Sequence, residues 1–304
     1  MDYNEIKDGG NCLLKSLERI VVAVTIIAFW SVLIIGAYVL LSEDSSDDSS
    51  MNGSDSTMED ILNAETEDQE SCNVFGLNIH GAVVTYHAND VFDSDQNLTA
   101  DQTSADEILH FVQKANNDEK IKGVLVEIDS YGGSPVGGEE IMNAFKHSSK
   151  PVVAYIRDRG TSAAYLAATG AQTIFASKWS DIGSIGVTYS YLDYTEKNRK
   201  EGVKFIELSS GKFKDTGSPD KPLTEAEKAL YQRDMVIVRD GFVQLVAQNR
   251  KLNVADVSKL ADGSTIMGDA ALKAGLIDKI GSYYDAKEFI KEKIGSDVEV
   301  CWKN

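Results

Sequence analysis

The apolar and polar positions divide the chain into three regions. Residues 20–41 form a run of 22 residues without a charge, between a short polar start (1–19) and a polar stretch (42–71). From residue 72 to residue 304, short apolar runs alternate with amphipathic ones. We therefore expect one membrane-spanning helix, one unfolded linker and one large folded domain.

The apolar run 20–41 is long enough to cross a bilayer. A helix of this length extends over about 33 Å at about 1.5 Å per residue, and the hydrocarbon core is about 30 Å thick. A cleavable signal sequence has a shorter apolar run and a small-residue cleavage site, whereas this run ends in YVLLSEDSS. Three basic residues precede it, and the next one is Lys114. The positive-inside rule then predicts a cytoplasmic N-terminus, with all residues after the span outside the cell membrane.

The stretch 42–71 is predicted to be an acidic, disordered stalk. Residues 43–70 contain eleven Asp and Glu and no Lys or Arg. A segment with so few apolar groups cannot offset its ordering entropy by burial, and repulsion among its carboxylates keeps it extended. The stalk would separate the membrane from the folded domain.

The folded domain 72–304 has the pattern of an α/β protein. Its most apolar runs, IKGVLVEID (121–129) and PVVAYI (151–156), are predicted to be strands buried on both faces. Helices with caps and apolar residues at helical spacing occur between such runs. Further strands are predicted at 74–87, 171–177, 203–208 and 297–302, and helices at 103–118, 139–147, 194–202 and 223–250. Alternation at these short intervals favours a parallel sheet with crossover helices.

Charge and residue usage exclude several functions. The net charge of −18 argues against nucleic acid as a partner, because phosphate binding needs clustered Lys and Arg. The three cysteines lack a zinc-site spacing, and the four histidines all lie at or before residue 147, so no metal or other cofactor is expected. Cys72 and Cys301 flank the folded domain, where a disulfide and two free thiols are equally compatible with the sequence.

Ser162 is the candidate nucleophile of the domain. It follows the strand at 151–156 and precedes a run of small residues, in a GTSAA segment close to the G-x-S-x-G pattern. That pattern needs a histidine after the serine, and none follows His147. A histidine before the serine belongs to an all-β fold, which the alternation argues against. A lysine remains as the base, and it acts only as the neutral amine.

The candidate base is Lys214, 52 residues after Ser162 in the loop SSGKFKDTGSP. A loop after a strand can aim a side chain, whereas most later lysines lie in exposed helical patterns. Spacing alone does not separate Lys214 from a solvated loop lysine. The turn Gly132-Gly133 and the turn serine Ser184 also have ordinary structural interpretations.

Five segments in order resemble the signal peptide peptidase A family of membrane-anchored serine proteases. SSGKFKDTGSP resembles that family's S-G-x-x-K-D-x-x-S-P segment, and TSAAYLAATGAQTIFAS resembles its nucleophile helix. Three more segments are similar to its glycine loop, its G-S-I-G-V turn and its C-terminal segment: EIDSYGGSPVGGEEI, DIGSIGV and LADGSTIMGDAALKAGLIDKIG. The resemblance covers roughly residues 74–285 and implies a ClpP/crotonase-like βα spiral domain.

The resemblance also implies the roles of individual residues. Ser162 is the nucleophile and Lys214 the general base of a Ser-Lys dyad. Gly132 and Gly133 supply backbone N–H groups to the oxyanion hole, together with the N–H of Ser162. Ser184 holds the lysine amine by a hydrogen bond.

Substrate and partners follow from the same resemblance. We expect cleaved signal peptides left in the bilayer as substrates and a ring-like homo-oligomer as the assembly. Serine and lysine come from neighbouring chains in some members, which predicts that one isolated chain holds the two residues far apart. No cofactor is implied.

The sequence departs from the family pattern beside the site. Ala163 and Ala164 replace two glycines after the nucleophile, which preserves the helix but narrows the pocket. Tyr131 replaces a proline before the glycine turn. None of these changes removes a catalytic atom.

Two other functions fit the same features less fully. A stomatin-cleaving membrane protease of the same clan also uses Ser and Lys, with a shorter spacing between them. A non-proteolytic crotonase-like protein that binds acyl-CoA shares the fold and the glycine-based oxyanion hole, but it needs neither a membrane anchor nor a serine and lysine so placed.

Overall fold

The computed structural model describes residues 72–87 and 101–303. The predicted cytoplasmic segment (1–19), membrane span (20–41) and stalk (42–71) lie outside the described residues. Among the helices that are described, none is both long enough and apolar enough to cross a bilayer.

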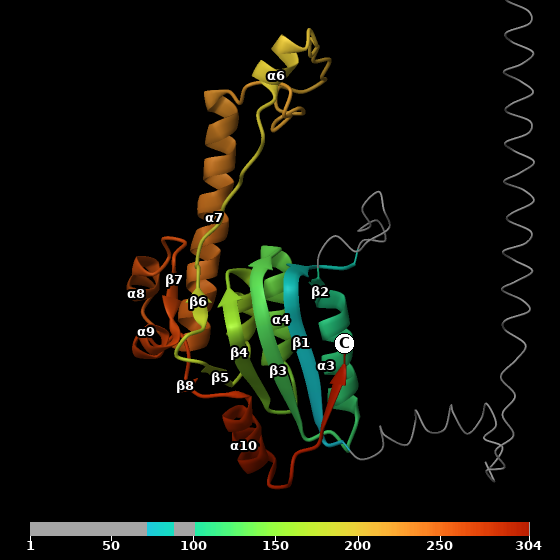
Figure 1. The fold of residues 1–304 in the computed structure, drawn as a ribbon, viewed down its shortest axis with the longest axis vertical. Helices are drawn as coiled ribbons and strands as arrows, with labels where there is room; N and C mark the ends of the chain where they lie inside the picture. Colours follow the sequence, from blue (N-terminus) through green and yellow to red (C-terminus); the bar gives the residue numbers. More distant parts are fainter. Residues whose placement is uncertain (1–71, 88–100, 304) are drawn as a thin grey trace, which may run out of the picture. The chain divides into compact units, whose positions relative to one another are not determined.

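A parallel sheet forms the centre of the domain (Figure 1). Its strand order is β2-β1-β3-β4-β5-β8, and every pair along this path is parallel. The longest strands carry the apolar runs that predicted them, because a strand covered on both faces has few polar positions. The strands are β1 (Val74–Val84), β2 (Gln102–Ser104), β3 (Gly123–Gly133), β4 (Val152–Thr161), β5 (Thr173–Ala176) and β8 (Lys279–Ile280). The predicted α/β class is confirmed.

Three short strands extend the sheet beyond this path. They are β6 (Asp181–Gly183), β7 (Thr265–Met267) and β9 (Val300–Lys303). β6 pairs in parallel with the end of β4 and is antiparallel to β7, and β9 runs parallel to the first half of β1. The end of β4 is therefore held between β3 and β6, immediately before Ser162.

Helices cover both faces of the sheet. α3 (Ala105–Asn117), α4 (Pro135–Lys146) and α5 (Ala163–Ala168) pack on one face, against residues such as Val124 and Val126 of β3. α10 (Tyr283–Ile294) packs with Leu125 and its neighbours on the other face. Successive residues of β3 thus point to opposite cores, as a period of two requires. α4 begins four residues before the predicted start, because Ser134 caps it and Pro135 occupies its first turn.

The helix α7 (Glu225–Arg250) joins the core at its C-terminal end, where Phe242, Val243 and Val246 are buried. Its N-terminal half carries the segment that contains α6 (Thr195–Lys200), at the end of α7 away from the sheet (Figure 1). We call residues 189–237 the arm. The remaining helices are α8 (Val254–Lys259) and α9 (Gly268–Lys273).

One predicted strand in the arm is wrong. Val203–Leu208 has strand-like composition, but the structure gives these residues no regular secondary structure. A strand exists only with a partner, and this exposed segment pairs with none of the described strands.

A disulfide joins Cys72 to Cys301, with 5.7 Å between their Cα atoms. Cys72 lies just before β1 and Cys301 lies in β9, in register with Phe75, so the pairing of the two strands brings the ends of the described domain together. The sequence was equally compatible with a disulfide and with two free thiols, and the structure has the disulfide.

Candidate active site

Ser162 lies where β4 ends and α5 begins. Its backbone has φ 53° and ψ −127°, a conformation that residues with a Cβ atom rarely adopt. Two hydrogen bonds hold it there: its N–H donates to the Gly183 carbonyl (2.7 Å), and its carbonyl accepts from Leu166 N–H (3.0 Å). Such a strained conformation persists only where the surrounding structure enforces it. Strained residues of this kind are concentrated at functional sites.

The side chain of Ser162 faces a cavity of about 840 Å³. The residue is half-buried, and its hydroxyl caps no backbone N–H of α5. This volume is within the range of ligand pockets, which is about 300–1,000 Å³. The walls are mainly apolar and come from α4, α5, α7 and the segment after β6: Val136, Leu166, Val187, Val238, Phe242 and Leu245. A serine hydroxyl is thus presented to a space that can hold an apolar side chain.

Gly132 packs directly against Ser162. Its φ is +95°, and a Cβ atom on it would lie 2.7 Å from the Ala163 nitrogen and 2.8 Å from the Ser162 Cβ. Only glycine fits this position without moving the serine. The predicted glycine turn is therefore adjacent to the predicted nucleophile, and Gly133 also lines the cavity.

Two of the three predicted oxyanion donors already have acceptors. Gly132 N–H donates to the hydroxyl of the buried Ser130 (3.0 Å), and Ser162 N–H donates to the Gly183 carbonyl. The second bond continues the ladder between β4 and β6. Either N–H would have to exchange its acceptor before it could bind an oxyanion.

Ser184 lines the same cavity as Ser162. Its backbone also has a positive φ, 48°, and its hydroxyl donates to the Gly263 carbonyl (2.9 Å). That bond uses the hydroxyl hydrogen and leaves the oxygen lone pairs as acceptors. Ser184 is thus placed where it can accept a hydrogen bond from an amine in the cavity.

Lys214 lies in the arm, apart from the cavity of its own chain. It is exposed, in a turn at residues 210–217, and it does not line the cavity. The neighbouring Thr216 hydrogen-bonds to Glu227 in the first turn of α7, whereas the cavity meets α7 only from Val238 onward. These two positions of α7 are 11 residues apart, or about 16 Å at about 1.5 Å per residue. One chain therefore does not bring its serine and lysine into hydrogen-bond reach.

The cavity wall formed by α7 was not predictable from the sequence. Val238, Phe242 and Leu245 have the spacing of a helix face, which predicts packing but not that part of the face borders a cavity. The cavity also has two carboxylates, those of Glu139 and Asp262. Hydrogen bonds from Ser264 lower the pKa of Asp262. Within the described residues, no group of three or more His, Cys, Asp or Glu side chains could hold a metal ion.

Comparison with known protein families identifies the chain. The sequence profile of peptidase family S49 matches residues 144–297, half of the chain. This chain belongs to peptidase family S49. The matched S49 region includes Ser162, Ser184 and Lys214, and Gly132 and Gly133 precede it. The predicted membership of a serine peptidase family is confirmed.

Individual S49 relatives include proteins named as proteases. A putative protease of Methanocaldococcus jannaschii is 33% identical over 186 residues, which are 60% of this chain and 60% of that protein. A putative signal peptide peptidase of Enterococcus faecium is 30% identical over 220 residues, 71% of this chain and 62% of that protein. The chain thus spans about three fifths of each relative's length. Among solved structures, a mutant of a membrane-bound stomatin-specific protease superposes with a TM-score of 0.47 at 15% identity, over 77% of this chain and 98% of that one.

Proposed function

We propose that this chain is a membrane-bound serine endopeptidase in which Ser162 is the nucleophile and Lys214 of a neighbouring copy is the general base. The observation that carries the proposal is the strained backbone of Ser162. It presents to an apolar cavity a hydroxyl that makes no capping hydrogen bond to the helix α5. Membership of peptidase family S49 supports it, because the matched region contains both residues.

The reaction follows the acyl-transfer scheme of serine peptidases. The Ser162 oxygen attacks the peptide carbonyl while the lysine amine takes the hydroxyl proton. The backbone N–H of Gly133 stabilises the oxyanion, joined by that of Gly132 or Ser162 once it has exchanged its present acceptor. The lysine then protonates the leaving amine, and water hydrolyses the acyl-enzyme with the same base. A lysine serves as base only as the neutral amine, which burial against a second chain favours.

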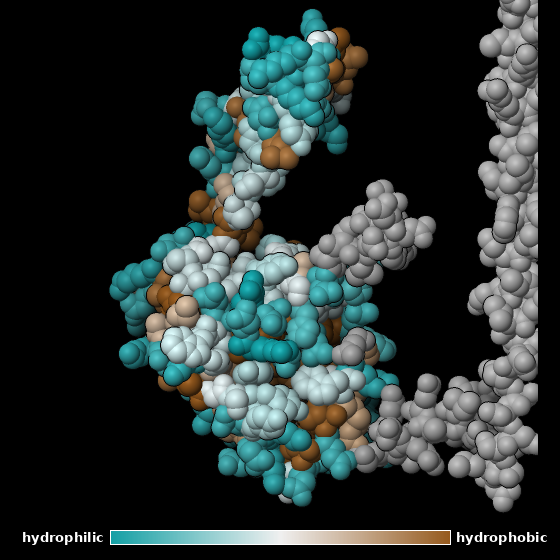
Figure 2. Space-filling model, viewed as in Figure 1, coloured by the Kyte–Doolittle hydropathy of each residue, from teal (hydrophilic) through white to brown (hydrophobic). Residues whose placement is uncertain are grey.

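The position of the arm supports the use of a neighbouring copy. Ser162 and Lys214 are apart in one chain, so a complete site needs a lysine from elsewhere. The arm also exposes large apolar side chains: Leu208 is 94% exposed and Ile206 is 69% exposed. Figure 2 shows hydrophobic residues at the surface around α6 and along α7. Exposed apolar groups of this extent are typical of a protein interface, here one within a ring-like homo-oligomer.

The cavity supports an apolar peptide as substrate. Its walls are formed largely by Val, Leu and Phe side chains, which fit the apolar core of a cleaved signal peptide. An enzyme tethered by residues 20–41 would meet such peptides in the bilayer where they are left. The name of the Enterococcus faecium relative points to the same substrate class.

The disulfide supports a location outside the cytoplasm. Disulfides persist in oxidising compartments and are rare in the cytosol. The bond between Cys72 and Cys301 agrees with the orientation that the positive-inside rule predicts for the folded domain.

Mixed assemblies test the shared site. Ser162→Ala and Lys214→Ala should each abolish cleavage of a quenched apolar peptide. Chains of the two variants that are co-expressed should regain about a quarter of the parent activity, because random mixing completes one in four interfaces. Each variant carries a different affinity tag, so that sequential purification demonstrates co-assembly. Co-assembled chains without activity would argue against a base from the neighbouring copy, and activity in either single variant would argue against the dyad.

A further inference from the structure

Glu227 is a buried carboxylate in the arm. It is 2% exposed, and of the charged residues that the structure describes it alone is classed as buried. Oxygen Oε2 belongs to a capping box at the start of α7: it accepts hydrogen bonds from Thr224 N–H (2.8 Å) and from the Thr224 hydroxyl (2.7 Å). A capping box needs only one carboxylate oxygen and forms readily at the protein surface. Capping therefore explains neither the burial of Glu227 nor the contacts of its other oxygen.

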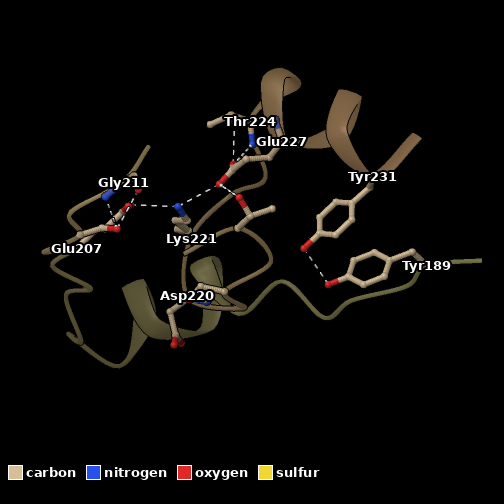
Figure 3. A network of polar contacts seen from close by, with 11 residues as sticks. Tyr189, Glu207, Gly211, Asp220, Lys221, Thr224, Glu227 and Tyr231 are labelled. Atoms are coloured by element: carbon tan, nitrogen blue, oxygen red, sulfur yellow. Dashed lines mark hydrogen bonds and ion pairs between the residues drawn. The ribbon is translucent and has the colours of Figure 1, made fainter. Parts of the chain in front are cut away.

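The second oxygen of Glu227 faces the segment that carries Lys214 (Figure 3). Oε1 lies 3.1 Å from Lys221 Nζ and accepts a 3.4 Å hydrogen bond from the hydroxyl of Thr216, two residues after Lys214. Lys221 also pairs with Glu207 at 3.0 Å, so this ion-pair network joins both sides of the turn to α7. The hydrogen bonds from Thr224, assisted by Lys221, lower the pKa of Glu227 to about 2, and the carboxylate stays charged at neutral pH.

A pair of tyrosines, Tyr189 and Tyr231, lies beside Gly217 at the same end of the turn as Thr216. Figure 3 shows the two rings and their hydrogen bond. The rings of Tyr189 and Tyr231 stack with centroids 4.0 Å apart, and their hydroxyls are hydrogen-bonded at 3.0 Å. Gly217 fits beneath them with φ +82°, and a Cβ atom there would lie 2.4 Å from the Tyr231 oxygen. The turn at 210–217 is thus fixed to α7 at two points on the side that follows Lys214.

We propose that Glu227 is a positioning residue for Lys214: its second oxygen fixes the turn at 210–217 on α7 and so sets the direction in which Lys214 leaves the arm. This inference rests on the proposed function, in which Lys214 must reach a serine of another chain. A base acts only within hydrogen-bond distance, and an error of about 1 Å in its placement can cost about a hundredfold in rate. An exposed lysine on an unfixed turn would not meet that requirement.

The first test compares two substitutions in the first turn of α7. Glu227→Gln keeps an amide oxygen for the capping box but removes the charge that holds Lys221. Glu225→Gln removes the same charge from an 89% exposed side chain, whose one ion-pair partner among the described residues is Lys228. Steady-state cleavage of the quenched apolar peptide by the full-length chain should show a kcat at least tenfold lower for Glu227→Gln, with KM within twofold of the parent. Glu225→Gln should match the parent in both constants.

The second test isolates the contact with the turn. Thr216→Val removes the hydroxyl that reaches Glu227, keeps the β-branched shape, and leaves the capping box and the Lys221 pair intact. Thr216→Ser keeps the hydroxyl. We expect kcat to fall several-fold in the valine variant and to recover in the serine variant, again without a matching change in KM. If Glu227→Gln does not fold, the comparison of Thr216→Val with Thr216→Ser still tests the positioning role of Glu227.

Light scattering and circular dichroism on the same samples separate positioning from stability or assembly. A loss of kcat that follows an equal loss of folded or assembled protein would overturn the proposal, as would a parent-like kcat in Glu227→Gln or in Thr216→Val. Lys214→Ala is measured alongside. If Lys214→Ala is inactive and Glu227→Gln is not impaired, the positioning role alone is wrong. If Lys214→Ala is active, the proposed dyad itself is wrong.

Discussion

Gly132→Ala should disable Ser162 without unfolding the domain. The added methyl group would lie 2.8 Å from the Ser162 Cβ, 2.7 Å from the Ala163 nitrogen and 2.8 Å from the Thr161 carbonyl oxygen. Ordinary carbon–carbon contact begins at about 3.5 Å, so the serine or the glycine turn must move by more than half an ångström. The serine cannot rotate away freely, because the Gly183 and Leu166 hydrogen bonds hold its backbone.

The size of the effect follows from that displacement. A misplacement of about 1 Å can cost a factor of about 100 in rate, which corresponds to about 2.7 kcal/mol of transition-state stabilisation. The positive φ of +95° adds strain for alanine, about 1–2 kcal/mol. For a domain of this size each kcal/mol lowers the melting temperature by about 2–4 °C. We therefore expect kcat to fall about a hundredfold, with a melting temperature only about 2–8 °C lower.

The assay measures kcat for the quenched peptide and thermal unfolding on the same full-length preparation. Gly295→Ala, after α10, is the matched control, since its φ of +70° carries a similar backbone strain while nothing lies within 4 Å of its added methyl group. A parent-like kcat in Gly132→Ala would show that the contact with Ser162 does not matter for catalysis. A loss of activity explained wholly by unfolding would contradict the argument equally.

Two further predictions concern stability. The disulfide closes a loop with a sequence separation of 229 residues, for which the chain-entropy relation gives about 5 kcal/mol of stabilisation. The double variant Cys72→Ser/Cys301→Ser should lose up to this amount of unfolding free energy, measured by denaturant unfolding. Reductant should lower the unfolding free energy of the parent but not that of the variant. The folded-state pKa of Glu227, about 2, lies below its ordinary value of 4.5, so its stabilising contribution is complete above pH 4.5 and disappears as the pH falls towards 2. The difference in unfolding free energy between the parent and Glu227→Gln should therefore shrink over that range, and a constant difference would contradict the assignment.

The sequence predicted the parts of the fold that depend on local pattern. The buried strands β3 and β4 were predictable because both of their faces are covered, and the placement of Ser162 between β4 and α5 followed from the small-residue run after it. The same reasoning failed at Val203–Leu208, where strand-like residues have no partner strand among those described. The three-residue strands β2 and β7 were missed because they are defined by distant partners and not by their own composition.

The candidate site was predictable as a set of residues but not as an arrangement. Motifs named Ser162, Gly132 and Lys214, and the structure puts the first two in contact and the third on the arm. The commitment of the Ser162 and Gly132 N–H groups to other acceptors depends on the ladder with β6 and on the buried Ser130. The sequence does not distinguish Glu227 from an ordinary capping-box glutamate, because its second oxygen gains partners only when the arm folds against α7.

The separation of Ser162 from Lys214 also has a consequence for how the activity of the enzyme would be regulated. Under the proposed arrangement a single chain contains every catalytic group and yet no complete site. Activity per chain would then rise with the density of chains by mass action and vanish on dilution. A tether that confines copies to one membrane surface raises their effective concentration and therefore favours complete sites. A newly made chain would therefore be inactive until it associates with another copy. No inhibitory propeptide would be needed to keep it inactive before then.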